Sequence, residues 1–365
     1  MSNNKILNLI EPTLFDQTGH SYGYVQSLIA ANADIGFNLN IWLDQRGASL
    51  LKEQSCTTQP YFYRPLRQVQ KLFLYWKLIR RAEIIFISTT ELWDLKILRF
   101  YSKYFSSKAK IVLHFHQFKQ APAKLKYLQH IAASCKDIAI LVPTQKLAEF
   151  FQKQGFAQCT VIPCPTFSPP RSINNTNSEF NKILYAGAAR RDKGFATVIN
   201  LLHHFRSQQN YLPFEVQISA PNSQRYDLET QAALQLLQNI SNDNLTLHNK
   251  TLDQQQYLAL FENAICLLLY DQKDYQDKFS GIALDAFYAG CPIITVKNTW
   301  MGDTAEKYGA GIALDDYSYA SIQAAIEKII NNYAFYHCNA KQAALQLGEL
   351  HDPKNTLRYI SKQCC

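Results

Sequence analysis

The stretch from residue 264 to residue 296 constrains the fold of this chain more than any other segment does. An apolar run, AICLLLY, predicts a buried strand over Ala264–Tyr270, and a charged loop follows it. The next segment, Ile282–Ala289, predicts a helix that ends at Gly290, and Pro292–Val296 predicts another strand. This order is typical of a parallel α/β sheet, in which ligands bind at the carboxyl ends of the strands.

The loop of this unit has the composition of an anion site. Ser280 is a favourable N-cap, and Gly281 lets a ligand approach the first free N–H groups of the helix. Asp277 and Asp285 flank the turn, eight positions apart. Carboxylates accept hydrogen bonds from hydroxyl groups, so a phosphate site beside them predicts a site for a sugar nucleotide. The alternative is an ordinary loop with a helix cap and two solvated acids.

A second candidate for phosphate binding follows the predicted strand Ile183–Gly187. Arg190, Arg191 and Lys193 come just before Gly194, at the turn into a predicted helix. Three cations and a glycine at such a turn predict a clamp for a diphosphate. A solvated basic loop is the alternative.

The amino-terminal part of the chain opens with a similar β-α-β pattern. Strands are predicted over residues 5–10 and 39–43, with a helix over residues 22–35 between them. There is no complete Gly-x-Gly-x-x-Gly motif, so a dinucleotide site is not supported. Gly19, just before the helix, is a candidate contact for a donor phosphate, and a simple tight turn is the equal alternative.

A further strand, predicted over residues 111–116, ends in a histidine. His116 therefore faces the edge of the sheet where ligands bind, although a structural role is common for a single histidine. His114, two residues earlier on the same face, is a weaker candidate.

The length of 365 residues predicts two domains rather than one core. The expected boundaries are an amino-terminal domain over residues 1–166, a linker over 167–182, a carboxyl-terminal domain over 183–348 and a final helix over 349–365. The linker is rich in Pro, Ser and Asn. Nine scattered cysteines without metal-ligand spacing favour reduced thiols in the cytoplasm.

Positive charge is concentrated in one region. Residues 60–126 hold fourteen Lys or Arg against three acids, whereas the net charge of the whole chain is +8. Such a region suits an anionic membrane surface, a polyanionic substrate or a nucleic acid. No motif for reading nucleic acid is present, so no nucleic acid is expected. Residues 64–81 predict a helix that either packs on the core with a basic solvated face or lies on a membrane surface.

These motifs resemble those of the retaining GT-B glycosyltransferases of group 1, the family-four-like enzymes. The resemblance covers nearly the whole chain and is most specific over residues 264–296. Its elements in this sequence are Asp277, Phe279-Ser280-Gly281, Asp285, Ala289-Gly290 and Pro292, together with Lys193-Gly194 and His116. Two departures stand out: the family has Glu where this chain has Asp277 and Asp285, and Arg where it has Ala188.

The resemblance implies an α/β fold of the GT-B type, in which two Rossmann-like domains face a central cleft and the last helix crosses back to the first domain. It implies retaining transfer of a sugar from a nucleotide diphosphate sugar to a hydroxyl acceptor, with that donor as co-substrate and no metal or other cofactor required. Asp277 would contact the sugar, Asp285 the ribose, Lys193 the diphosphate and His116 the reacting hydroxyls. Arg190 or Arg191 would replace the missing arginine at position 188.

The expected setting is cytoplasmic, or peripheral at the inner face of the membrane, in the synthesis of a surface polysaccharide or glycolipid on a sugar or lipid-linked acceptor. Two alternatives remain open. One is another GT-B enzyme, either an inverting transferase or a sugar-nucleotide epimerase. The other is a non-catalytic relative that binds a sugar nucleotide or a protein partner.

Overall fold

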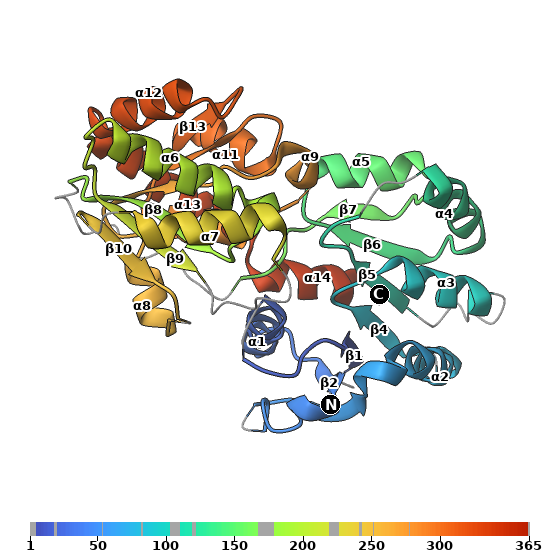
Figure 1. Ribbon diagram of the computed structural model, residues 1–365. Helices are drawn as coiled ribbons and strands as arrows, with labels where there is room; N and C mark the ends of the chain where they lie inside the picture. The colour runs from blue at the N-terminus through green and yellow to red at the C-terminus, as the bar shows by residue number, and fades with distance from the viewer. Residues whose placement is uncertain are drawn as a thin grey trace. The chain divides into compact units, whose positions relative to one another are not determined.

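The computed structural model of the chain describes residues 5–17, 20–52, 54–81, 83–102, 110–118, 122–166, 179–218, 226–240, 243–250, 252–276 and 278–363. The chain divides into two compact units (Figure 1). The first unit comprises Met1–Phe167 and Leu350–Cys365, and the second comprises Ser168–Glu349. Most of the predicted linker, residues 167–178, lies outside the described residues.

The first unit is built on a seven-stranded parallel sheet with the strand order β3-β2-β1-β4-β5-β6-β7. Its strands are β1 (Ile6–Glu11), β2 (Asn38–Asp44), β3 (Thr57–Phe62), β4 (Ile84–Ile87), β5 (Lys110–His114), β6 (Ile138–Val142) and β7 (Cys159–Val161). Its helices are α1 (His20–Asn32), α2 (Arg67–Arg80), α3 (Leu92–Tyr101), α4 (Pro122–Ser134), α5 (Gln145–Lys153) and α14 (Pro353–Gln363). Short 3-10 turns cover Gln45–Gly47 and Arg64–Leu66.

The second unit repeats this plan with a six-stranded parallel sheet in the order β10-β9-β8-β11-β12-β13. Its strands are β8 (Lys182–Gly187), β9 (Phe214–Ile218), β10 (Leu245–His248), β11 (Ala264–Leu267), β12 (Ile293–Val296) and β13 (Gly311–Leu314). Its helices are α6 (Phe195–Ser207), α7 (Leu228–Asn239), α8 (Gln254–Ala259), α9 (Gln272–Tyr275), α10 (Gly281–Tyr288), α11 (Trp300–Tyr308), α12 (Tyr319–Ile330) and α13 (Tyr333–Leu350), with a 3-10 turn at Arg191–Lys193.

Both sheets are doubly wound in the Rossmann manner. In each unit the chain starts in the middle of the sheet, builds strands to one side, and then crosses to the other side. The crossing point lies between β1 and β4 in the first unit and between β8 and β11 in the second. Ligands of open α/β sheets bind beyond the carboxyl ends of the strands at such a switch point. The predicted α/β architecture with two Rossmann-like domains is confirmed.

Burial on both faces explains why the central strands are continuous apolar runs. Along β8, Ile183 and Tyr185 face one apolar cluster, which also contains residues of α6 and α12. Leu184 and Ala186 face a second cluster, which contains residues of α10, α11 and α13. Helices therefore cover both faces of the sheet in the second unit, and the loops at its carboxyl edge are held from both sides.

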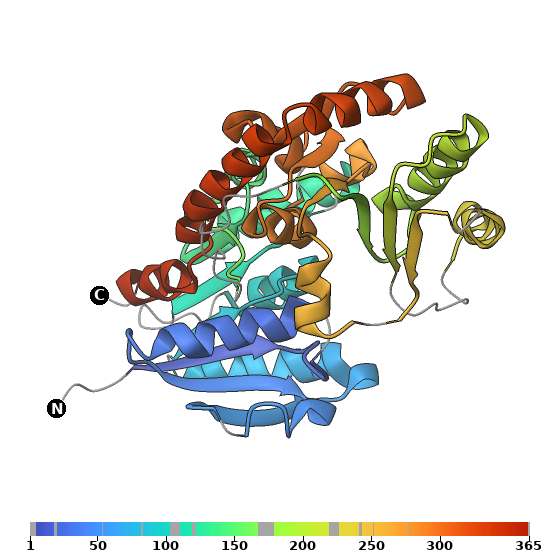
Figure 2. The same cartoon turned by 90° about the vertical axis from the view of Figure 1, so that its left-hand side faces the viewer.

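The last helix, α14, belongs to the first unit although it comes at the end of the chain. It packs against α1, beside which it lies in Figures 1 and 2. Leu357 and Ile360 are fully buried there, and the Lys354 Nζ lies 2.6 Å from the Asp34 Oδ2. The His351 Nδ1 lies 2.8 Å from the Cys164 carbonyl oxygen, which links the start of this segment to the end of the first unit's sheet.

Several elements differ from the sequence prediction. The strands β3 and β13 were not predicted, because TTQPYF begins with three polar residues and contains Pro, and GIAL is very short. Thr299 caps α11 and accepts a hydrogen bond from the Gly302 N–H at 3.1 Å. Strand β5 ends at His114, so His116 lies in the following loop. Within the described ranges, no helix has both the length and the apolar composition of a membrane span.

Candidate functional site

Lys193 lies at the switch point of the second unit. A Cβ atom built on Gly187, the last residue of β8, would lie 3.3 Å from the Lys193 Nζ. The same Nζ lies 5.8 Å from the centroid of the Tyr270 ring, which follows β11. The pKa of Lys193 is lowered to about 8, mainly by burial and also by the nearby charge of Arg190, while Asp192 has an opposing effect. A partly desolvated ammonium group therefore stands where an anionic ligand would be stabilised.

The loop that carries Lys193 is fixed by a glycine and by one backbone hydrogen bond. Gly194 has φ +66°, and a Cβ atom there would lie 1.8 Å from the Leu269 carbonyl oxygen, so only glycine fits. The Asp271 N–H donates to the Asp192 carbonyl oxygen at 3.0 Å. These contacts tie the loop after β8 to the segment after β11.

The two candidate arginines differ in their surroundings. The Arg190 Nη2 lies 2.7 Å from the Asp192 Oδ2 and 3.5 Å from the Tyr275 hydroxyl, and its charge acts on Lys193. Arg191 is exposed. The pKa of Asp227 is lowered mainly by hydrogen bonds from Thr230, and the charge of Arg191 makes a smaller contribution. Arg190 is therefore the cation that lies with Lys193. At Ala188, where the family has arginine, the backbone carbonyl accepts a hydrogen bond from the Tyr185 hydroxyl at 2.9 Å.

Ser280 and Gly281 form the start of α10. The Ser280 Oγ accepts from the Ala283 N–H at 3.3 Å, so the predicted N-cap is confirmed. A Cβ atom on Gly281 would find no atom within 4 Å, so the space beside the first helical residue is open. The side chain of Ile282, the next residue, lies 2.7 Å from the position of a Cβ on Gly187, which links this helix start to the end of β8.

Asp285 lies one turn further along α10. Its Oδ2 accepts a hydrogen bond from the Tyr257 hydroxyl at 3.2 Å. Burial raises the pKa of Asp285 to about 6, and the hydrogen bond from Tyr257 opposes this rise. Tyr257 comes from α8, and no feature of the sequence marked it. Two other predicted residues, Asp277 and Gly19, lie outside the described residues.

The first unit also gathers polar groups at its switch point, around a residue that the sequence reading did not single out. Glu11 ends β1 and is fully buried, and its Oε2 accepts from the Ser88 Oγ at 2.7 Å and from the Thr89 Oγ1 at 2.6 Å. Its Oε1 accepts from the Thr13 N–H at 3.2 Å and from the Thr13 hydroxyl. An acid at the end of the apolar run ILNLIE was the only available signal.

The two candidate histidines have different environments. His114 is fully buried, and its Nδ1 lies 2.5 Å from the Tyr24 hydroxyl. Burial lowers the pKa of His114 well below its ordinary value, and His116 adds to this effect, so the ring is neutral. His116 stacks on Tyr24 with 5.3 Å between ring centroids and keeps some exposure. Of the two, only His116 keeps any exposure, and its Nε2 is buried.

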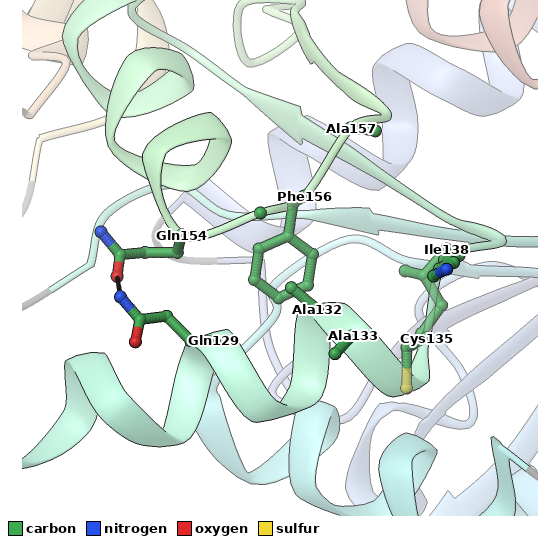
Figure 3. Close-up of a pocket in the computed structure, with 10 residues that line it drawn as sticks. Gln129, Ala132, Ala133, Cys135, Ile138, Gln154, Phe156 and Ala157 are labelled. Carbon is green, nitrogen blue, oxygen red and sulfur yellow. Dashed lines mark hydrogen bonds between the residues drawn. The ribbon is translucent and has the colours of Figure 1, made fainter.

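A cavity of about 310 Å³ lies elsewhere in the first unit (Figure 3). It is lined by the end of α4, the first residue of β6 and the segment after α5, including Cys135, Ile138 and Phe156. This is the amino end of β6, away from the carboxyl ends where the predicted residues gather. Among the described residues, no group of three or more His, Cys, Asp and Glu side chains has the arrangement of a metal site.

Comparisons with known proteins identify the family of the second unit and the fold of the chain. The family model of the glycosyl transferases group 1 matches residues 169–346, which is nearly the whole second unit. Sucrose-phosphate synthase from Thermosynechococcus elongatus is 16% identical, with 99% of each chain covered and a TM-score of 0.71. A glycosyltransferase from Rickettsia africae is 12% identical, with 99% of each chain covered and a TM-score of 0.73. HepE of Anabaena, in complex with UDP-glucose, is 14% identical, with 98% of each chain covered and a TM-score of 0.67.

No curated protein matches the sequence. The likeness to the solved structures establishes the GT-B fold. The family match assigns the second unit to the glycosyl transferases of group 1, and the chain is a glycosyltransferase.

Proposed function

We propose that this chain transfers a sugar from a nucleotide diphosphate sugar to a hydroxyl acceptor with retention of the anomeric configuration. The observation that carries the proposal is Lys193, a partly desolvated cation at the switch point between β8 and β11. Arg190 lies with it, and the open start of α10 at Gly281 adds free N–H groups. Negative charge develops on the leaving diphosphate as the glycosidic bond breaks, and preorganised donors of this kind stabilise it.

The remaining predicted residues have complementary roles in the proposal. Asp285 accepts hydrogen bonds from the ribose hydroxyls, and Asp277 accepts them from the sugar. His116, which keeps some exposure, positions the reacting hydroxyls. Because Arg190 and Lys193 supply the positive charge, the proposal requires no metal ion. The acceptor hydroxyl attacks from the face of the leaving group, and the departing phosphate takes its proton.

The acceptor class is proposed from the charge distribution of the chain. The basic region over residues 60–126 suits an acceptor at an anionic surface, such as a lipid-linked or polymeric sugar. We therefore propose a role in the synthesis of a surface polysaccharide or glycolipid, on the cytoplasmic side of a membrane. HepE of Anabaena was solved with UDP and with UDP-glucose, so uridine nucleotides are the first donors to test.

Calorimetric titration with UDP-glucose and with GDP- and ADP-sugars tests the donor site. The native chain should bind one of them, and Lys193→Ala and Asp285→Ala should each weaken that binding by roughly ten- to a hundredfold, as expected when a charge-assisted contact is lost. Lys328→Ala, an exposed lysine of α12, is the matched control and should bind like the native chain. A folded native chain that binds none of these ligands at millimolar concentration would contradict the proposal.

Product analysis tests the reaction itself. With the donor identified, the anomeric configuration of the transferred sugar, read by proton NMR, should match that of the donor. Inversion would point to the alternative GT-B reaction, and binding without transfer to any sugar or lipid-linked acceptor would point to the non-catalytic alternative. A chelator should leave the transfer rate unchanged, whereas a loss restored by a divalent metal would contradict the role proposed for the two cations.

A further inference from the structure

The helix α2 has an outward face that the core of the first unit does not use. Its inner side buries Leu74, Tyr75 and Leu78 in that core, which matches the core-packed reading of this helix. On the outer side, spacings of three and four residues align one stripe along the helix. The stripe consists of Leu66, Val69, Phe73, Lys77 and Arg80.

The exposed fractions show how unusual this stripe is. Leu66, just before the helix, is 55% exposed, Val69 is 51% exposed and Phe73 is 66% exposed. Single exposed apolar residues are common on soluble proteins, but a row of them on one helix marks an interaction surface.

Helix α3 continues the surface. Phe100 is 68% exposed and Trp93 is 41% exposed. The Trp76 ring of α2 and the Tyr101 ring of α3 are 5.2 Å apart, and Phe100 lies beside Tyr101 at 5.0 Å. The two helices are neighbours in the structure (Figure 1). Together they form the α2–α3 surface, made of the stripe on α2 with Trp93 and Phe100.

Cations surround these apolar side chains. They are Arg64, Arg67, Lys77, Arg80, Lys96 and Arg99. The Arg80 guanidinium lies 5.3 Å from the Trp76 ring centroid, and the Lys96 Nζ lies 5.7 Å from that of Trp93. Of the two acids at the start of α3, Asp94 is buried, with its Oδ1 2.7 Å from the Nζ of the buried Lys71, so only Glu91 is exposed beside these cations.

We propose that the α2–α3 surface docks on a bilayer containing anionic phospholipids. Side chains such as Phe73 and Phe100 enter the boundary between headgroups and acyl chains, while the surrounding Lys and Arg side chains contact lipid phosphates. Exposed apolar side chains with basic side chains beside them, on the outer faces of two neighbouring helices, suit a shallow interface of this kind. This inference names a surface and a partner, and it stands independently of the donor site in the second unit.

Vesicle co-sedimentation of the full chain tests the proposal. The native chain should bind vesicles of phosphatidylcholine with phosphatidylglycerol much better than vesicles of phosphatidylcholine alone. The variant Lys77→Gln/Arg80→Gln should bind the anionic vesicles roughly 30-fold more weakly, since each basic residue near the membrane contributes about a factor of five. The variant Phe73→Ala/Phe100→Ala should lose on the order of tenfold or more.

Matched controls come from the second unit. Phe335 of α13 is 60% exposed, so Phe335→Ala removes a comparable aromatic ring, and Lys307→Gln/Lys328→Gln removes two exposed positive charges. Both controls should bind vesicles like the native chain. Donor binding, measured by calorimetry on every variant, should be unchanged, which separates a docking defect from misfolding and from failure of the proposed enzymatic function.

Three results would overturn the proposal. The first is equal binding of the native chain to neutral and anionic vesicles, or none to either. The second is unaltered binding by both α2–α3 variants. The third is an equal loss of vesicle binding in the control variants of the second unit. Such a loss would show that binding depends on the net charge and hydrophobicity of the whole chain rather than on the α2–α3 surface.

Discussion

At the scale of single residues, two ionisable groups set the conditions under which the candidate site can bind its ligand. Burial lowers the pKa of Lys193 to about 8 and raises that of Asp285 to about 6. In the proposed function, the protonated Lys193 binds the diphosphate, and ribose hydroxyls donate to the ionised Asp285 carboxylate. Both groups therefore have the required charge only between these two pH values.

The first prediction is a bell-shaped pH dependence of affinity for the donor nucleotide sugar. The association constant should be highest between about pH 6 and pH 8 and should fall by up to tenfold per pH unit on either side, because one proton is exchanged at each limit. Calorimetric titration across this range measures it. Lys193→Arg keeps its charge at high pH, so this variant should lose the alkaline limb; an alkaline limb that persists in Lys193→Arg would assign it to another group.

The second prediction separates the stability contribution of Asp285 from its binding role. Because its pKa is higher in the folded protein than in the unfolded chain, the stability that it contributes is fully present at low pH and is lost as the pH rises to about 6. Asp285→Asn removes this loss and should raise the free energy of unfolding at pH 7 by on the order of 1 kcal/mol, while donor affinity falls. Chemical denaturation and calorimetry measure the two effects.

Tyr257→Phe is the companion variant. It removes the hydrogen bond that opposes the rise in the pKa of Asp285, so the acid limb of donor affinity should move to higher pH. The second prediction would be contradicted if Asp285→Asn had a lower free energy of unfolding at pH 7 than the native chain, because burial of the charged carboxylate would then not be destabilising.

At the scale of elements, the glycine at the start of α10, Gly281, has open space beside it, whereas Gly194 in the loop after β8 is closely packed. A Cβ on Gly281 would meet open space, so the third prediction is that Gly281→Ala folds normally and binds the donor at least tenfold more weakly, because the methyl group occupies space beside the N–H groups. Gly194→Ala should instead fail to fold, since its Cβ would collide with the Leu269 carbonyl. Thermal unfolding with and without donor measures both. Unchanged donor affinity in Gly281→Ala would place the ligand elsewhere.

Element-level features were largely predictable because they depend on local pattern. Apolar runs located the central strands, and the cap at Ser280 followed from residue type and position. Edge strands such as β3 were missed because they are half polar, and edge strands carry little apolar signal. The partners of Glu11 and Asp285 lie 77 and 28 positions away from them, at Ser88 and Tyr257, and no local pattern encodes such distances.

At the scale of the whole molecule, the carboxyl-terminal segment belongs to the first unit rather than to the second unit, which it follows in sequence. The residues from Leu350 onward belong to the first unit although the second unit comes between them and the rest of it. Helix α14 contributes Leu357 and Ile360, both fully buried, to a contact with α1. The stability of the first unit therefore depends on residues that follow the second unit in sequence, and it should be separable from the stability of the second unit.

The fourth prediction tests this dependence with Leu357→Ala. Truncating a fully buried leucine should destabilise the first unit by about 2–5 kcal/mol. Three of the four tryptophans, Trp42, Trp76 and Trp93, lie in the first unit, so the loss should appear as an earlier transition in tryptophan fluorescence during chemical denaturation. Donor binding should persist through that transition, because the residues that we propose bind the diphosphate and the ribose, Lys193 and Asp285, lie in the second unit. Leu345→Ala in α13 is the control: Leu345 is 45% exposed, and its truncation should change stability by less than about 0.5 kcal/mol. Equal destabilisation by the two substitutions, or loss of donor binding with Leu357→Ala under native conditions, would contradict this division of the chain.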